Sequence, residues 1–395
     1  ATSTTQSSGH IRSRGTAYLD LYTGSNFLPS VRVNTGTTTV LATSSPFVAT
    51  MNNLLTIDTG ATFRIEAGGY TLIMNDSVVN NGSIASGNTA SDFRMFGTHF
   101  INNGAVSAYN FEFESPQAAP NQYRYIQGTG RFTSVNLTFL EGTFAQLLSN
   151  HSFAYFTINS GSTLDLNSKA MKITGSGSPL TVNGALITGG STIEYNGTAA
   201  QSTMHSGISY ANMTINNPAG VTVTQNFSLP GLLNIVSGDL ELNGKVITLL
   251  GSGSLSETAG NTVKGNTGYI TTTRSINAPN ALNIAGLGAV ITSSANFGLT
   301  EVRRGHTVQT TPGGPSIRRY YVIRPDNNSG LNATCVFKYD ESELNSINES
   351  SLKMLKSTNA GSTYLVGGGT VNTTQNTVTV TAINDFARHT LGLGL

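Results

Sequence analysis

The residues of this chain that could perform acid–base chemistry are mainly carboxylates, and one close pair of them alternates with aromatic residues. Glu112 and Glu114 follow Phe111 and Phe113. At positions i and i+2 of a strand, two side chains share one face and lie roughly 7 Å apart. Such a pair could cleave a polysaccharide, but the same alternation is typical of an ordinary amphipathic strand. A polysaccharide lyase or hydrolase is therefore one alternative.

Metal and cofactor chemistry finds little support in the sequence. The six histidines are scattered, and the single cysteine, Cys335, lies in an apolar run where we expect it to be buried. No EF-hand loop, nucleophile elbow or phosphate-binding loop occurs. We therefore expect a protein that is not an enzyme and that has no cofactor and no metal.

The elements that must position these residues are indicated by a repeated segment. Residues 55–65 match residues 156–166 in residue class, and a shorter copy spans residues 233–242. Each copy is typical of a strand, a Gly turn and a second strand, with apolar residues at every second position. Repetition of such a unit predicts a solenoid. The predicted fold is all-β: a degenerate right-handed β-helix (β-solenoid) followed by an antiparallel β-sandwich.

Changes in composition along the chain predict three parts. Residues 1–50 are rich in Ser and Thr and are expected to form an N-terminal extension or cap, donated to a neighbouring subunit. Residues 51–295 carry the strand–turn segments of the solenoid. Aromatic and charged residues and longer strands appear in residues 296–395, which predicts a separate β-sandwich that closes the end of the solenoid.

The charge of the chain argues against several kinds of partner. The sequence has 21 basic and 20 acidic residues, a net charge of +1, and only 10% charged residues. Nucleic-acid binding needs a concentrated cationic face, which we do not find. No run of 18 apolar residues exists, so we expect no membrane span. A nearly neutral chain lacks strong self-repulsion, which favours association with other copies of itself.

The repeats at residues 55–63, 78–84 and 233–242 resemble those of large secreted surface proteins and adhesins from Bacteroidota. The C-terminal part looks like the β-sandwich that often follows such repeats, in residues 319–325, 337–344, 371–383 and 384–392. In that family a sorting domain recognised by the type IX secretion machinery commonly comes next. The resemblance implies secretion and surface placement, and it assigns no catalytic residues. Because the chain begins without an initiator Met or a signal peptide, we expect a processed mature form or a trimmed piece of a longer chain.

These observations predict an extracellular structural protein, secreted or attached to the cell surface. Its expected partners are other copies of itself, assembled into a filament, sheath or surface layer by β-strand addition. The candidate subunit contacts are Tyr18, Leu19, Leu21, Tyr22, Arg303 and Arg304.

The alternative function is a cell-surface adhesin that binds glycan or another cell through the aromatic stretch around residues 93–125. Its candidate ligand contacts are Phe93, Phe111, Phe113, Tyr123 and Tyr125. The same rings could instead be large core residues of solenoid strands. A trimeric phage tailspike is a further alternative.

Overall fold

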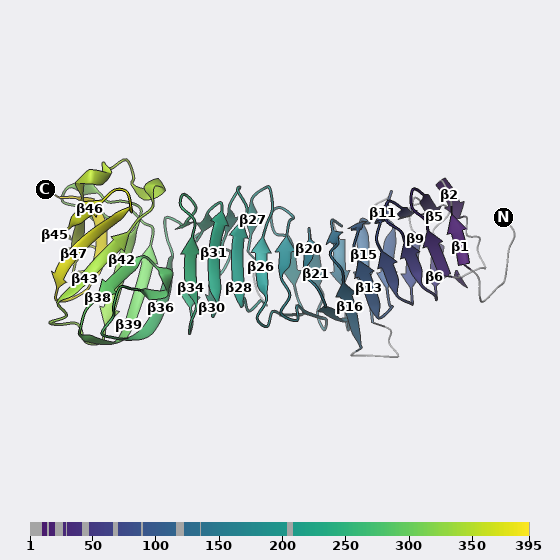
Figure 1. The fold of residues 1–395 in the computed structure, drawn as a ribbon, viewed down its shortest axis with the longest axis horizontal. Helices are drawn as coiled ribbons and strands as arrows, with labels where there is room; N and C mark the ends of the chain where they lie inside the picture. The colour runs from purple at the N-terminus through teal and green to yellow at the C-terminus, as the bar shows by residue number, and fades with distance from the viewer. Residues whose placement is uncertain are drawn as a thin grey trace. The chain divides into compact units, whose positions relative to one another are not determined.

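The computed structural model of the chain is all-β, a β-solenoid with almost no helix (Figure 1). It describes residues 10–13, 16–19, 27–28, 30–41, 47–65, 70–87, 90–115, 122–134, 136–203 and 208–394. The chain divides into two compact units, residues 1–209 and 210–395. The helical segments within these ranges are three short 3₁₀ turns, η1 (Ile284–Gly286), η2 (Glu341–Glu343) and η3 (Glu349–Ser351).

The first unit consists of short parallel strands in three sheets, to which successive coils contribute one strand each (Figure 1). The first sheet contains, in order, β1 (His10–Ser13), β4 (Ser30–Val33), β7 (Leu55–Ile57), β10 (Val78–Asn80), β13 (His99–Asn102), β16 (Tyr123–Gln127), β19 (Phe144–Leu147), β22 (Thr163–Asp165) and β25 (Ala185–Ile187). The second sheet contains β2 (Thr16–Leu19), β5 (Thr38–Leu41), β8 (Thr62–Ile65), β11 (Ser83–Ser86), β14 (Ala105–Ser107), β17 (Arg131–Phe132), β20 (His151–Phe153), β23 (Met171–Ile173) and β26 (Thr192–Tyr195). The third sheet contains β3 (Phe27–Leu28), β6 (Phe47–Met51), β9 (Tyr70–Met74), β12 (Asp92–Met95), β15 (Asn110–Phe113), β18 (Asn136–Phe139), β21 (Phe156–Ile158) and β24 (Leu180–Val182). β27 (Gln201–Ser202) follows them in the chain.

The core of the first unit is a column of apolar side chains inside the coils. Strands bury every second residue, as in β7, where Leu55 and Ile57 are buried and Thr56 is half-buried. Because neighbouring coils pair in register, like residues stack: Phe93 of β12 pairs with Phe111 of β15. Period-2 burial and parallel register together explain why the repeated apolar pattern produces one continuous core.

The corners between strands depend on Asn and Gly. Asn80 and Asn102 are both buried, and Asn80 Nδ2 donates to Asn102 Oδ1 at 2.8 Å, so the same corner of two coils is joined by a side-chain hydrogen bond. Gly104 follows in the second of these corners, where a Cβ atom would lie 1.9 Å from the carbonyl oxygen of Gly82. Only glycine fits at that position, because the backbones of adjacent coils approach each other so closely.

The second unit begins with more parallel strands. Two parallel sets are β28 (Asn212–Asn216), β31 (Leu232–Ser237) and β34 (Ser254–Glu257), and β29 (Val221–Thr222), β32 (Leu240–Glu241) and β35 (Val263–Lys264). The third set is β30 (Phe227–Leu229), β33 (Val246–Leu249) and the long strand β36 (Tyr269–Asn277). β36 pairs in parallel with β33 and antiparallel with β39 (Asn296–Gly305). One sheet therefore changes from parallel to antiparallel pairing at β36.

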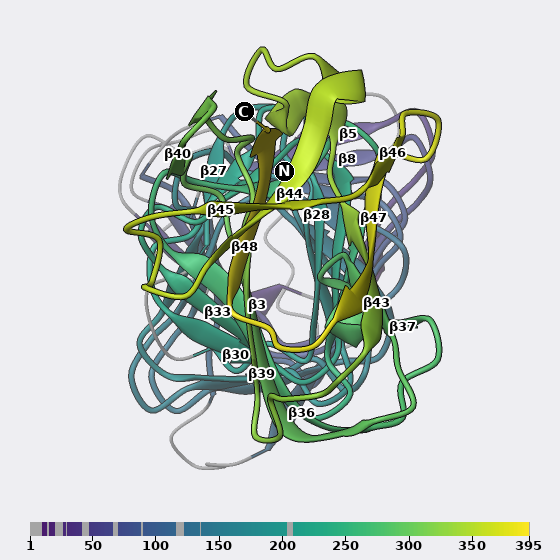
Figure 2. The same cartoon turned by 90° about the vertical axis from the view of Figure 1, so that its left-hand side faces the viewer.

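The remaining strands of the second unit pair antiparallel. Beyond β39 the same sheet continues with β42 (Tyr320–Pro325), β48 (Arg388–Leu393), β44 (Leu352–Ser357) and β45 (Leu365–Gly368). Another sheet contains β37 (Leu282–Asn283), β38 (Ala289–Thr292), β43 (Ala333–Lys338), β47 (Thr377–Ile383) and β46 (Thr370–Asn372), and β40 (Thr310–Thr311) pairs with β41 (Gly314–Pro315). In Figure 2, β43, β46 and β47 lie together on the right, beside β39, β44 and β48.

Side chains from these two sheets contact one another. The ring centroid of Phe337, on β43, lies 5.6 Å from that of Tyr321 on β42 and 5.4 Å from that of His389 on β48. Cys335 is buried on β43, as predicted, and burial raises the pKa of its thiol.

The prediction of an all-β solenoid is confirmed, but its limits differ from the predicted ones. The solenoid does not begin at residue 51, because β1 and β2 pair in parallel with β4 and β5 of the same chain. Neighbouring coils can order a polar segment by main-chain hydrogen bonds, which composition does not reveal. Antiparallel pairing begins at β36, ahead of residue 296. Within the described ranges, no helix is long and apolar enough to cross a membrane.

Candidate functional site

Three of the five aromatic residues proposed as ligand contacts lie in the core. Phe93, Phe111 and Phe113 are each 0% exposed. The rings of Phe93 and Phe111 are stacked, with centroids 6.0 Å apart. A ligand at the surface would not touch these three side chains, so the prediction of a ligand contact is wrong for them. They are large core residues of the solenoid strands, which was the alternative interpretation of this aromatic stretch.

The other two aromatic residues face outward. Tyr123 and Tyr125 occupy the half-buried positions of β16, which alternate with the buried Arg124 and Ile126. Their ring centroids lie 6.1 Å apart, and the ring of His99, on the adjacent strand β13, is tilted against that of Tyr125 with centroids 5.1 Å apart. Rings that two neighbouring strands place on one outer face form a surface that a partner could reach.

Glu112 and Glu114 share one face of the coil, as their spacing predicts, but an arginine lies between them. Arg94 Nε is 2.9 Å from Glu112 Oε2, and its Nη1 is 3.7 Å from Glu114 Oε2. Burial raises the pKa of Glu112, and the charge of Arg94 opposes that rise. The two carboxylates are thus held as one ion-paired group.

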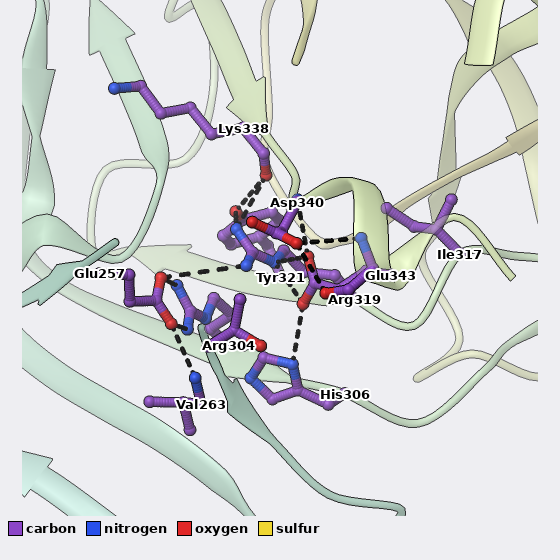
Figure 3. Close-up of polar contacts among 12 residues, drawn as sticks. Glu257, Val263, Arg304, His306, Ile317, Arg319, Tyr321, Lys338, Asp340 and Glu343 are labelled. Carbon is purple, nitrogen blue, oxygen red and sulfur yellow. Dashed lines mark hydrogen bonds and ion pairs between the residues drawn. The ribbon is translucent and has the colours of Figure 1, made fainter. Parts of the chain in front are cut away.

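A group of buried charges lies in the second unit, where the parallel and antiparallel strands meet (Figure 3). Arg304 of β39 is fully buried, although its guanidinium carries a charge. Its Nη1 and Nη2 atoms donate to the two oxygens of Glu257, the last residue of β34, at 2.8 and 2.5 Å. A bidentate pair of this kind fixes the direction of both side chains.

A second buried pair adjoins the first. Arg319 Nε lies 2.8 Å from Glu343 Oε2, and His306 Nδ1 lies 3.2 Å from Glu343 Oε1. Burial alone would raise the pKa of Glu343, but Arg319 and His306 outweigh it and lower that pKa to about 2. Burial lowers the pKa of His306, which keeps the imidazole neutral near pH 7.

We call these five residues the buried charge cluster: Glu257, Arg304, His306, Arg319 and Glu343. Tyr321 and Asp340 adjoin it. Tyr321 donates its hydroxyl proton to the carbonyl of Lys338 at 2.9 Å. Asp340 caps η2 and accepts a hydrogen bond from the backbone N–H of Gly260 at 2.8 Å. The cluster and this cap therefore join the last coil to the antiparallel strands.

A polar cavity of about 410 Å³ lies beside the buried charge cluster. Its lining includes His306 and Glu343 together with Asp239, Lys264 and Arg318. Lys264 Nζ and Asp239 Oδ2 are 2.7 Å apart, so two of these lining charges neutralise each other. Among the described residues, no group of three or more potential metal-ligating side chains occurs here or elsewhere.

The candidate subunit contacts are placed very differently from one another. Arg304 cannot meet another subunit because it is buried against Glu257. Arg303 is partly exposed, and its guanidinium lies over the ring of Tyr269 at 4.7 Å.

The remaining candidate contacts come from the N-terminal region. Tyr18 and Leu19 belong to β2, whose backbone pairs with β5. The side chains of Tyr18 and Leu19, and the whole of Leu21 and Tyr22, lie outside the described residues.

Most of the buried charge cluster was not predicted from the sequence. Glu257, His306 and Arg319 come from segments that are far apart in the sequence, and no local spacing connects them. The one signal was Asp340, three residues before Glu343, since this spacing is typical of a capping box.

Comparison with protein-family models, with curated proteins and with solved structures finds no match to this chain. What the chain does must therefore be inferred from its own residues.

Proposed function

We propose that this chain is a non-enzymatic, extracellular structural protein, the subunit of a self-assembling filament, sheath or surface layer. Subunits join by addition of a β-strand to an open sheet edge. The extracellular location is supported by the resemblance of the repeats to those of secreted surface proteins. The low content of charged residues, 10% of the chain, supports self-association.

The observation that carries this proposal is the edge strand β45. It is the last strand of its sheet and pairs with β44 on one side. Leu365 is 77% exposed and Val366 is 46% exposed, and the strand has no charged residue and no proline. Natural proteins usually protect such edges with lysine, proline or a covering segment. An apolar edge that carries neither lysine nor proline favours the addition of another strand.

The interior of the same sheet supports a subunit with a closed end. β36 covers β33 and is itself covered by β39, so no further coil can add there. We take the two antiparallel sheets as a β-sandwich that caps the coils, as the sequence predicts. The proposed counterpart of β45 is β2 of a neighbouring copy, with Tyr18 and Leu19. Among the described strands, β2 lies at one end of its sheet, where it pairs with β5.

A lysine at the edge tests this proposal. Leu365→Lys places a charge on β45, and we expect the polymer to disappear from the pellet after sedimentation, because an added strand would bury that charge. Leu299→Lys is the matched control: Leu299 is 53% exposed but lies on β39, which is paired on both sides. Equal sedimentation of the Leu365→Lys variant and the wild type, at unchanged β-sheet circular dichroism, would overturn the proposal.

A further inference from the structure

The outer face of the first sheet carries a group of aromatic rings, which we call the aromatic platform: His99, Tyr123, Tyr125 and Phe144. They come from three adjacent strands, β13, β16 and β19, with His99 opposite Tyr125 and Tyr123 opposite Phe144. Ring centroids lie 5.1 Å apart for His99 and Tyr125, and 6.4 Å apart for Tyr123 and Phe144. The rings therefore cover a continuous area of the sheet.

These rings lie on the outer face because the residues that alternate with them in the same strands point into the core. Phe100, Ile126 and Ala145 of the same three strands are buried. His99 is exposed, and Tyr123 is half-buried. The inward apolar residues already satisfy the need for a core, so folding does not require aromatic residues on the outer face. Grouped aromatic residues at the surface mark a contact site more often than isolated ones do.

Polar groups adjoin the aromatic platform on one side. Gln146 pairs with Tyr125 in the register of β19 and β16, and Asp165 pairs with Gln146 on the next strand, β22. Gln146 Nε2 donates to Asp165 Oδ2 at 2.9 Å. The second amide hydrogen of Gln146 and the remaining lone pairs of both side chains can still bind a hydroxyl group.

The charge of this face limits the kind of partner. From β13 to β22, no outward position of the described strands is a lysine or an arginine. A carboxylated or sulfated polymer would find no cation there to bind its anionic groups. Asp165 would repel such a polymer. The chemistry fits a neutral, hydroxyl-rich ligand with flat apolar faces.

We propose that the aromatic platform binds a neutral polysaccharide. The apolar C–H faces of its pyranose rings stack on Tyr125, Tyr123 and His99, and its hydroxyl groups hydrogen-bond to Gln146 and Asp165. Adjacent strands are about 4.8 Å apart, so a sugar chain running from coil to coil meets a new strand at intervals comparable to one sugar unit. This binding activity goes beyond self-assembly and would attach the proposed polymer to a polysaccharide matrix.

Affinity electrophoresis in native gels tests this proposal. The gels contain, one at a time, hydroxyethylcellulose, laminarin, galactomannan and soluble starch as neutral probes, and alginate as the anionic probe. We expect at least one neutral probe to retard the protein and alginate to have no effect. Tyr125→Thr keeps a strand-forming residue on the outer face and should weaken the retarding interaction at least 10-fold. The matched control is Tyr155→Thr, because Tyr155 is also half-buried but lies outside the aromatic platform.

Each outcome of this experiment decides the proposal. Retardation by a neutral probe that Tyr125→Thr loses and Tyr155→Thr retains supports it. The absence of retardation in every neutral gel overturns it, and so does an equal loss in the two variants. Retardation by alginate alone would also overturn it, since it would indicate an ionic contact. The Leu365→Lys variant should bind the probe like the wild type, which separates failure of binding from failure of assembly.

Discussion

Arg304 holds both carboxylate oxygens of Glu257 with its two terminal nitrogens, although the residues lie 47 positions apart in the sequence. Glu257 ends the parallel strand β34, and Arg304 lies in the antiparallel strand β39. Arg304 is fully buried, so it has no water to replace the carboxylate. The pair therefore fixes how the last coil and the antiparallel strands of the second unit join.

Loss of this pair should destabilise the second unit strongly. Arg304→Met removes the cation and leaves the Glu257 carboxylate without its main partner, and we expect the free energy of unfolding to fall by about 3–5 kcal/mol. The control is Lys264→Met, which breaks the exposed pair with Asp239 and should change stability by about 1 kcal/mol or less. Urea unfolding measures both. Similar small losses in the two variants would contradict a structural role for the Arg304–Glu257 pair.

The stability of the second unit should fall as the pH falls below about 6.5. Burial, together with the charge of Lys356, lowers the pKa of His389 to about 3, and burial also lowers that of His306. The unfolded chain binds protons at these histidines near pH 6.5, while the folded chain does not, so acid favours unfolding. Each histidine contributes a slope of up to about 1.4 kcal/mol per pH unit.

Unfolding curves between pH 7.5 and 4.5 measure this slope. His389→Leu removes one of the two groups and should reduce the slope by about half, whatever its effect on stability at pH 7.5. Below about pH 4.5 the depressed pKa of Glu343, about 2, adds a further loss, because this carboxylate stabilises the fold only while it is ionised. A stability that does not change between pH 7.5 and 4.5 would show that the buried histidines do not stay neutral.

Close contact between coils should make one glycine of the first unit irreplaceable. In Gly104→Ala the new Cβ would lie 1.9 Å from the carbonyl oxygen of Gly82, so adjacent coils must move apart, and we expect a loss of about 3 kcal/mol or more. At Gly190 the nearest atom to a new Cβ would be 3.9 Å away, and neither position requires a positive φ. Gly190→Ala should therefore be nearly neutral in thermal unfolding. Equal effects of the two substitutions on thermal unfolding would contradict the close approach of adjacent coils at Gly104.

The two groups of aromatic residues should respond differently to truncation. Phe111→Ala empties part of the core column and should lower the free energy of unfolding by about 3–5 kcal/mol. Tyr125→Thr, on the outer face of β16, should change it by about 1 kcal/mol or less. Urea unfolding of the two variants checks this difference. A large loss for Tyr125→Thr would mean that the platform is part of the core and would weaken its assignment to binding.

The repeated segments predicted the solenoid well, because burial follows the same alternation in each copy. Ile57 and Phe63 in one copy, and Ile158 and Leu164 in the other, are all buried. The start of the solenoid was not predictable in this way, since main-chain ladders order β1 and β2 without a strongly apolar sequence.

The aromatic stretch marks a second limit of sequence reasoning. Aromatic residues are frequent on both faces of these strands, and alternation alone does not say which set faces the core. Phe111 lies inward and Tyr125 outward because of the register with neighbouring coils. The buried charge cluster could not be predicted from the sequence for another reason. Glu257 and Arg304 are far apart in the sequence, and only folding brings them together.

The most direct test of self-assembly is negative-stain electron microscopy of the purified chain at physiological salt. Regular fibres or sheets in the wild type and in Leu299→Lys, and isolated particles in Leu365→Lys, are the predicted result. Isolated particles of the wild type at every protein concentration would contradict the proposal that this chain is the subunit of a polymer.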